Sequence, residues 1–274
     1  MGSTSLLADK VAVVTGGGGG IGKGIALAFA SHGAKVVVAE RDPVRAKATV
    51  AEIEASGGRA MASVVDVQEK DQCGTLADAA LREFGQVDVL VNNVGDYLAA
   101  KPFLETTEED WEALYHINLK HVFLCTRAIA PRMIERGSGG SIINVSTVEA
   151  FRGIPHCAVY SAFKGGVTQF TKSFALEVAQ YGIRVNAIAP DVTQTIQVPY
   201  DQWVPPEQRH LVPIWVPLGR FGMPDDIAGV AVFLASDLSR FVTGTTVHAD
   251  GGTYAAGGWY RTTSGRWTNS PLNP

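Results

Sequence analysis

The strongest constraint on the fold of this 274-residue chain is the alternation of short apolar runs with helical patterns. Stretches such as GKGIALAFASHG repeat apolar residues every three or four positions and stop at glycine. Strands that are apolar on both faces need helices on both sides of their sheet. The sequence therefore predicts an α/β fold with a mostly parallel, doubly wound, seven-stranded sheet. The predicted strands are VAVVT (11–15), KVVVAE (35–40), AMASVVDV (60–67), VDVLVNN (87–93), GSIINVS (140–146), IRVNAIAP (183–190) and TTVHADGG (245–252).

No linker interrupts this alternation, so we expect residues 1–274 to form one domain. Two regions lack the pattern: an insertion at 191–224, expected to cover a substrate as a lid, and a polar tail at 255–274. No run approaches the roughly 20 apolar residues of a membrane span. The N-terminal residues lack the pattern of a secretory signal. We expect a cytoplasmic protein without a membrane partner.

Composition narrows the class of ligand. The chain has 23 basic and 27 acidic residues, which disfavours a nucleic-acid partner and favours a small molecule. Cys73, Cys125 and Cys157 are widely spaced and are expected to be reduced thiols. His116 and His121 lack the spacing of zinc ligands, so no metal is expected.

The glycine-rich segment TGGGGGIGKG (15–24) connects the first predicted strand to a helix. Glycines at such a turn let the backbone approach a phosphate, and the helix N-terminus favours its negative charge. Two registers fit. Gly17, Gly19 and Gly22 match G-x-G-x-x-G, whereas Thr15, Gly16, Gly20 and Gly22 match the wider T-G-x-x-x-G-x-G spacing. The loop alone does not choose between them.

An acidic residue, Glu40, ends the second predicted strand. There it can accept hydrogen bonds from the adenosine ribose and would repel a 2′-phosphate. The loop glycines supply no positive charge either, so we predict NAD as cofactor, with NADP less favoured. Arg41 is the exception, because it could tolerate NADP by turning towards the ribose.

Other polar residues follow the later strands. Asp66 could accept a hydrogen bond from the adenine amino group, and Asn92, Asn93 and Gly95 bring amides and a close backbone to the carboxyl edge. Open α/β sheets bind ligands at that edge. We therefore expect the cofactor to lie along it.

Tyr and Lys four residues apart on a helix share a face, and the ammonium can lower the pKa of the phenol. Such a Tyr can act as general acid or base on a carbinol. The pattern occurs twice, at Tyr97/Lys101 and Tyr160/Lys164. Pro102 disfavours a helix at the first pair. We therefore assign the chemistry to the second pair.

Three further polar residues precede Tyr160. Ser146 and Thr147 follow the fifth predicted strand, and either hydroxyl could hold the substrate oxygen. Asn118, on the helix before that strand, could anchor a water-mediated proton relay to Lys164.

These motifs together, T-G-x-x-x-G-I-G, N-N-x-G, Asn118, N-x-S/T-S/T, Y-x-x-x-K and H-A-D-G-G, resemble the short-chain dehydrogenase/reductase family over residues 8–254. The resemblance implies a single Rossmann domain, an NAD(P)-dependent oxidoreductase and commonly a homotetramer. It implies that Tyr160 is the acid/base, that Lys164 binds the nicotinamide ribose, and that the wider glycine register is used. It also implies a cofactor-binding set of Gly16, Gly20, Ile21, Gly22, Glu40, Arg41, Asp66, Val67, Asn92, Val94, Gly95, Tyr160, Lys164, Pro190, Thr193 and Thr195.

Three positions depart from the family pattern. The catalytic hydroxyl usually lies thirteen residues before the Tyr, which selects Thr147 over Ser146. Val94 replaces an alanine, and Asp191 replaces the glycine after Pro190, which changes the local charge.

The substrate prediction rests on the lid. Its apolar residues can line a pocket for a lipophilic secondary alcohol or ketone. Residues 96–103 and Phe151 would form the opposite wall, and Trp259 could reach a neighbouring subunit. A 3-oxoacyl thioester reductase is the alternative, and a non-catalytic NAD-sensing protein is a further one. The lid residues concerned are Tyr200, Trp203, Leu211, Ile214 and Trp215.

Overall fold

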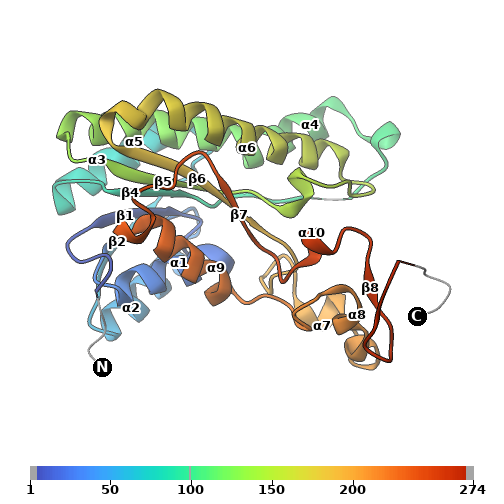
Figure 1. The fold of residues 1–274 in the computed structure, drawn as a ribbon. Helices are drawn as coiled ribbons and strands as arrows, with labels where there is room; N and C mark the ends of the chain where they lie inside the picture. The colour runs from blue at the N-terminus through green and yellow to red at the C-terminus, as the bar shows by residue number, and fades with distance from the viewer. Residues whose placement is uncertain (1–4, 99, 270–274) are drawn as a thin grey trace.

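The computed structural model describes residues 5–98 and 100–269, so Ala99 of the predicted wall and the last residues of the predicted tail lie outside it. Seven parallel strands form one sheet in the order β3-β2-β1-β4-β5-β6-β7 (Figure 1). This confirms the predicted doubly wound α/β fold. The strands are β1 (Val11–Thr15), β2 (Lys35–Glu40), β3 (Arg59–Val64), β4 (Val89–Asn92), β5 (Gly140–Val145), β6 (Ile183–Pro190) and β7 (Thr246–Ala249).

Helices cover both faces of the sheet (Figure 1). One face carries α1 (Gly20–Ser31), α2 (Pro43–Ala55) and α9 (Pro224–Ala235). The other carries α3 (Lys70–Phe84), α4 (Glu108–Tyr115), α5 (His121–Arg136) and α6 (Ala158–Val178). Each face has its own apolar core, with Phe29 and Ile25 in the first and Leu76 and Ile129 in the second, all fully buried. Burial on both faces explains why the strands are continuously apolar.

Short elements complete these layers. A π-helical turn, His116–Lys120, joins α4 to α5, so the helix predicted around Asn118 exists but contains a local widening. Single 3₁₀ turns occupy Phe103–Glu105, Val148–Ala150, Ala179–Tyr181 and Asp237–Ser239. Within residues 5–98 and 100–269, no helix combines the length and the apolar character that a membrane crossing requires.

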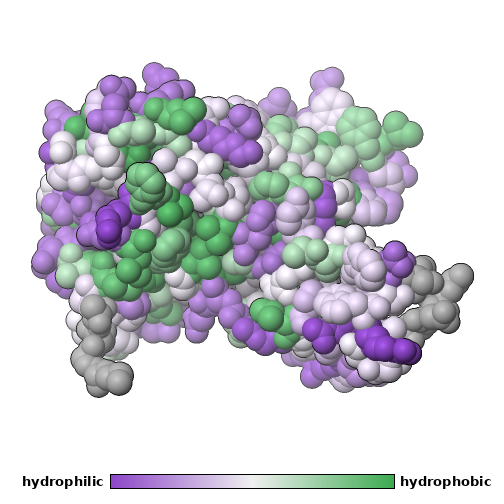
Figure 2. Space-filling view, in the orientation of Figure 1, coloured by the Kyte–Doolittle hydropathy of each residue, from purple (hydrophilic) through white to green (hydrophobic). Residues whose placement is uncertain are grey.

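The lid at 191–224 is a compact subregion rather than an irregular loop. It contains α7 (Tyr200–Trp203), a 3₁₀ segment (Pro206–Leu211) and α8 (Val212–Trp215) around a small apolar cluster. Beyond β7, α10 (Thr253–Ala256) leads to a hairpin of β8 (Tyr260–Arg261) and β9 (Trp267–Thr268). The surface is indented between the α4–α6 layer and this subregion (Figure 2).

The strand order reverses between β1 and β4, because the chain moves outwards to β2 and β3 and returns to the other side of β1. Ligands of open α/β sheets bind at this switch point. Thr15, at the end of β1, bridges the two strands: its hydroxyl donates to the main-chain oxygen of Val91 at 3.2 Å and accepts from the main-chain nitrogen of Asn93 at 2.9 Å. The fold thereby joins the glycine turn to the loop after β4.

Candidate active site

A cleft of about 740 Å³ runs along the carboxyl ends of the strands, from the glycine turn to the lid. Its volume falls within the range usual for small-molecule sites, roughly 300 to 1,000 Å³. All but three of the predicted site residues line it, and the exceptions are Gly22, Asn92 and Asn118. The structure thus brings most of the predicted site residues together at one cavity.

The glycine turn supports the wider register. Gly16 and Gly20 have positive φ values of 63° and 51°, which residues with a side chain rarely adopt. A Cβ on Gly22 would lie 2.2 Å from the main-chain oxygen of Gly16, so this position has no room for a side chain. Gly22 therefore packs against the backbone of the turn and does not line the cleft. A backbone this closely packed is the cradle that a dinucleotide phosphate requires.

The far end of the cleft lies beside Glu40, whose carboxylate accepts from the main-chain nitrogen of Asp42 at 3.1 Å. Arg41 and Arg45 line the same end, and Arg45 also pairs with Asp42 at 3.4 Å. A Cβ on Gly18 would lie 2.7 Å from Cγ of Glu40. Gly18 therefore does more than withhold a positive charge, because its small size leaves space for the Glu40 side chain.

The loop after β4 differs from the prediction in the placement of Asn92. Asn92 is fully buried, and its side chain donates to Oδ1 of Asn144 at 2.9 Å inside the core rather than reaching the cleft. Asn93 lines the cleft instead and donates to the main-chain oxygen of Thr15 at 3.0 Å. The cause is the strand alternation, since β4 still includes Asn92 and its side chain points to a covered face.

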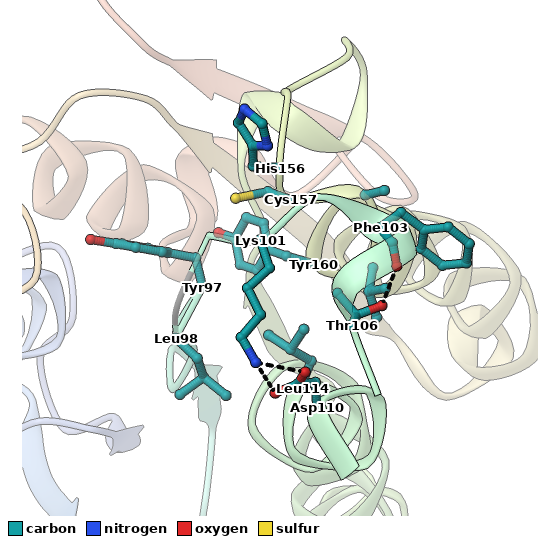
Figure 3. A pocket seen from close by; sticks show the side chains of 12 residues that line it. Tyr97, Leu98, Lys101, Phe103, Thr106, Asp110, Leu114, His156, Cys157 and Tyr160 are labelled. Carbon is teal, nitrogen blue, oxygen red and sulfur yellow. Dashed lines mark hydrogen bonds and ion pairs between the residues drawn. The ribbon is translucent and has the colours of Figure 1, made fainter. Parts of the chain in front are cut away.

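The two Tyr–Lys pairs occupy different structures. Tyr160 and Lys164 both lie on α6 and line the cleft, with Nζ of Lys164 6.0 Å from the centre of the Tyr160 ring. Tyr97 lies in a loop, and Lys101 turns away from Tyr160 to bind both carboxylate oxygens of Asp110 at 2.9 and 2.8 Å (Figure 3). These two side chains line a small cavity of about 70 Å³ next to Tyr160. Only the second pair lies on one helix with both side chains at the cleft, and its catalytic role stays a prediction.

The adjacent hydroxyls after β5 face different partners. Ser146 donates to the main-chain oxygen of Lys164 at 3.1 Å. Thr147 donates to the main-chain oxygen of Pro190 at 3.4 Å, and its hydroxyl lies close enough to Tyr160 to lower the pKa of that phenol. The geometry therefore favours Thr147 as the hydroxyl that acts together with Tyr160.

Burial is the largest influence on the pKa of Tyr160. The prediction that Lys164 lowers this pKa is therefore corrected. Removal from water raises the pKa of Tyr160 well above its usual value, and the carboxylates of Glu149 and Asp96 act in the same direction. The pKa of Lys164 is itself lowered to about 8, mainly by burial. Without a bound cofactor, Tyr160 is therefore a neutral phenol at neutral pH, and the neighbouring Lys164 is charged.

Lys164 is held from two sides. Its Nζ donates to the main-chain oxygen of Val145 at 3.1 Å, and a Cβ on Gly95 would lie 2.7 Å from that same nitrogen. Any side chain at position 95 would therefore collide with the Lys164 ammonium, which packs against the backbone of Gly95. Asp96 opposes the lowering of the lysine pKa by its negative charge.

Asn118 lies in the π-helical turn and is completely buried. Its amide donates to the main-chain oxygens of Asp96 at 2.7 Å and Leu114 at 3.0 Å, and its Oδ1 accepts from the nitrogen of Asp96 at 3.1 Å. The side chain is fully used in fixing the loop after β4. A π-helical turn is a frequent feature of functional sites, and here it also leaves the local helix backbone irregular.

The lid contributes fewer residues than predicted. Trp203 and Trp215 line the cleft. Tyr200 packs edge-on against Phe221 with ring centres 4.7 Å apart, and Leu211 and Ile214 are not among the lining residues. Phe151 packs against His248 at 4.7 Å instead of forming the opposite wall. Tyr200 therefore packs in the lid's own apolar cluster and Phe151 packs beside β7, whereas Leu211 is exposed.

The sequence interpretation missed several charged residues that line the cleft. Glu149 and Arg152 follow Thr147 closely, and Asp191 follows Pro190 at the end of the neighbouring strand. Asp96 and Tyr97 also line it and belong to the predicted wall 96–103, and Gln197 lines it from the predicted lid. The pairing of β5 with β6 in the sheet brings the first three together. Within the described ranges no cluster of His, Cys, Asp or Glu is arranged to hold a metal ion.

The fold is of the Rossmann type, and the Tyr160–Lys164 pair lies in a cleft at the carboxyl edge of its sheet. Residues 16–254 match the family described as enoyl-(acyl carrier protein) reductase. The chain belongs to the short-chain dehydrogenase/reductase family, as its relatives also show.

Three relatives illustrate the range of this family. A 3-oxoacyl-[acyl-carrier-protein] reductase of Thermotoga maritima is 39% identical over 246 residues, covering 90% of this chain and 98% of the relative. Galactitol 2-dehydrogenase of Agrobacterium fabrum is 40% identical over 256 residues, covering 90% and 98%. A solved structure of 7α-hydroxysteroid dehydrogenase with NADH and 7-oxo glycochenodeoxycholic acid is 33% identical, covers 92% of this chain and 97% of its own, and has a TM-score of 0.85. The relatives share the fold but differ in substrate.

Proposed function

We propose that this chain transfers hydride between NAD(H) and a secondary alcohol/ketone pair, with Tyr160 as general acid/base. The main support for the proposal is that the Tyr160 and Thr147 hydroxyls and the Lys164 ammonium line one cleft. The same cleft includes a glycine turn in which Gly22 has no room for a side chain. Positioned acid–base groups contribute about 10² to 10⁴ in rate.

Each polar residue then has a distinct task. Thr147 holds the substrate oxygen, and Tyr160 takes the carbinol proton during oxidation or returns it during reduction. Lys164 binds the nicotinamide ribose and carries the proton onward, while Asn118 fixes the loop beside it. The bound dinucleotide supplies the hydride-accepting ring and, in its oxidised form, a positive charge that favours ionisation of Tyr160.

The residues present fit such a cofactor. Gly16 and Gly20 adopt positive φ values without steric strain, and Gly22 leaves no room for a side chain. Together these glycines form a phosphate cradle at the start of α1. Glu40 at the other end supports NAD over NADP, because a carboxylate repels a 2′-phosphate. The NADH in the 7α-hydroxysteroid dehydrogenase structure agrees with this choice.

For the substrate, Trp203, Trp215 and Ile154 offer apolar surface in the same cleft as the polar groups, which supports a lipophilic alcohol or ketone. The alternative of a 3-oxoacyl thioester reductase is supported by the Thermotoga maritima relative. It requires attraction of an acidic carrier, yet Arg209 pairs with Asp201 and Arg220 pairs with Asp226 on the lid side. These neutralised pairs make the alternative weaker.

We further propose a cytoplasmic homotetramer. The family resemblance supports this assembly. Leu176 on α6 and Phe241, between α9 and β7, are exposed by 79% and 101% and are available for subunit contacts.

The test is a substrate panel of steroids, cyclic alcohols and β-hydroxyacyl thioesters, followed by NADH absorbance. Turnover of a secondary alcohol by the wild type, and its loss by about 10² or more in Tyr160→Phe, is the expected result. Fluorescence titration should show that Tyr160→Phe still binds NADH. Tight NADH binding without turnover of any compound would favour a sensing protein, and undiminished turnover by Tyr160→Phe would refute the assignment of the acid/base.

A further inference from the structure

Three charged side chains form a connected group on the wall of the cleft, which we call the Arg152 cluster: Glu149, Arg152 and Asp191. Nη2 of Arg152 donates to Oε1 of Glu149 at 2.8 Å and to Oδ2 of Asp191 at 2.8 Å, and Nε donates to Oε2 of Glu149 at 3.3 Å. The carboxylate side chains are only 12% and 9% exposed, whereas Arg152 is 36% exposed. The cluster is therefore a built feature of the wall rather than a set of mobile surface charges.

The Arg152 cluster flanks the reacting centre. Thr147 accepts a hydrogen bond from the main-chain nitrogen of Glu149 at 3.3 Å and donates to the main-chain oxygen of Pro190, the residue before Asp191. The charge of Glu149 also reaches Tyr160 and Cys157, where it raises both pKa values. The substrate oxygen held by Thr147 would thus lie beside the two chain segments that carry the cluster.

The position of Asp191 is fixed independently of Arg152. The hydroxyl of Thr253, on α10, donates to Oδ2 of Asp191 in a short hydrogen bond. Thr253 is buried, and Tyr254 beside it packs against Phe151. Contacts from β5, β6 and the segment after β7 therefore orient the same charged group.

The balance of charge indicates which ligands the cluster accepts. Two carboxylates and one guanidinium give a formal net charge of −1, so an anionic group would be repelled at short range. A hydroxyl can instead donate to a carboxylate oxygen and accept from the guanidinium. Nη1 of Arg152 has no hydrogen-bond partner within the described part of the chain and is left as the donor for such an interaction.

Resting on the proposed function, we propose that the Arg152 cluster binds a second hydroxyl next to the reacting carbinol, so that the substrate class is a neutral vicinal diol or α-hydroxy ketone. Oxidation of the diol passes one hydride to the dinucleotide and one proton to Tyr160, and the product is the α-hydroxy ketone. The hydrocarbon part of the substrate would contact the apolar lining residues Trp203, Trp215 and Ile154. An anionic carboxylate or acyl-carrier substrate is disfavoured.

The experiment compares three alcohols of matched ring size with the intact enzyme and NAD: cyclohexanol, trans-cyclohexane-1,2-diol and 2-hydroxycyclohexanecarboxylate. We expect kcat/KM for the diol to exceed that for cyclohexanol by about tenfold, since one or two added hydrogen bonds are worth about 1 to 1.5 kcal/mol. The carboxylate should be the poorest of the three. A wild-type preference for the carboxylate, or equal use of diol and cyclohexanol, would overturn the proposal.

The variants assign the preference to the cluster. Arg152→Lys keeps the positive charge but removes the guanidinium donors, and it should reduce the diol-to-cyclohexanol ratio by about tenfold. Glu149→Gln should raise use of the carboxylate relative to cyclohexanol, because the cluster loses its net negative charge. Arg220→Met is the matched control, because Arg220 pairs with Asp226 outside the cleft, and this variant should leave the ratio unchanged. An unchanged ratio in Arg152→Lys would refute the role of the cluster.

The proposal and the proposed function fail in different ways. Turnover of cyclohexanol or other simple alcohols without a diol preference refutes only the role of the Arg152 cluster. No turnover of any alcohol or ketone by the wild type, with either NAD or NADP, refutes the proposed function and the substrate class with it.

Discussion

The hydroxyl of Ser146 donates to the main-chain oxygen of Lys164 at 3.1 Å, so this side chain ties the end of β5 to α6. Its neighbour Thr147 instead faces Pro190 and Tyr160. Two adjacent hydroxyls therefore serve different purposes: Ser146 positions the helix that carries Tyr160, and Thr147 is available to the substrate. The sequence alone left this choice to a count of residues, whereas the hydrogen bonds give it a physical basis.

We predict that Thr147→Ala lowers kcat/KM for alcohol oxidation by about 10² or more, because the substrate oxygen loses its partner. Thr147→Ser should retain most activity, since it keeps the hydroxyl. Ser146→Ala should cost about 1 kcal/mol of unfolding free energy and less than tenfold in rate. Steady-state kinetics and urea unfolding separate the two effects. A larger rate loss in Ser146→Ala than in Thr147→Ala would reverse the assignment.

Cofactor preference depends on the carboxylate of Glu40. We predict that Glu40→Ser raises the NADP-to-NAD ratio of kcat/KM by about tenfold or more, because a charge pair at about 4 Å is worth about 1 to 4 kcal/mol near a protein surface. Arg41 and Arg45 remain at that end of the cleft to receive the 2′-phosphate. Kinetics with both cofactors at limiting concentration measures the ratio.

Glu54→Ser is a suitable control, because Glu54 is an exposed acidic residue of α2 away from the cleft. Glu40→Ser/Arg45→Ser should lose part of the gain if Arg45 contributes. Gly18→Arg is a poorer test of the same idea, since its Cβ would lie 2.7 Å from Cγ of Glu40 and would displace the carboxylate. A ratio that does not change in Glu40→Ser would remove the main support for NAD.

The fold was predictable because periodicity and strand composition carry it. Runs such as Val11–Thr15 and Ile183–Pro190 are buried almost throughout, and only a sheet covered on both faces allows this. The family resemblance implied the wider glycine register, and the topology places that turn and the Tyr160–Lys164 pair at the same edge of the sheet. Thr147 could be placed because it lies two residues after β5 and thirteen residues before Tyr160, which is the spacing of the family pattern.

Other features required coordinates. Whether the side chain of Asn92 or Asn93 reaches the cleft depends on where β4 ends, and a shift of one residue exchanges the two faces. The pKa values of Tyr160 and Lys164 depend on burial, which residue spacing does not reveal. Arg152 and Asp191 meet only because the loops after β5 and β6 fold towards each other.

His121 predicts a specific sensitivity to acid. The side chain is fully buried, and burial followed by the charge of Lys164 lowers the pKa of its imidazole to about 3 from a usual 6.5. The unfolded chain therefore binds this proton between those pH values while the folded one does not, and stability falls as pH falls through this window. At about pH 4 this single group costs about 3 kcal/mol relative to neutral pH.

His121→Leu should reduce this loss. Urea titration measures the stability of each protein. We expect the stability of the variant relative to wild type to increase by up to about 3 kcal/mol as the pH falls from about 7 to about 4. His116→Leu is the control, because His116 is partly exposed and pairs with Glu112 on the surface. Parallel pH profiles for wild type and His121→Leu would show that the imidazole does not control acid stability.

The lid is fastened to the opposite wall through Gln197. Its Nε2 donates to the main-chain oxygen of Gly95 at 2.9 Å and to Oδ2 of Asp96 at 3.0 Å, across the mouth of the cleft. Gln197→Ala should remove both hydrogen bonds and speed NADH release by about tenfold, since together they are worth about 1 to 1.5 kcal/mol. Stopped-flow fluorescence measures this rate, and where product release limits turnover kcat should rise with it. Gln202→Ala, on exposed α7, should release NADH at the wild-type rate. Equal release rates in all three proteins would mean that Gln197 does not hold the lid closed.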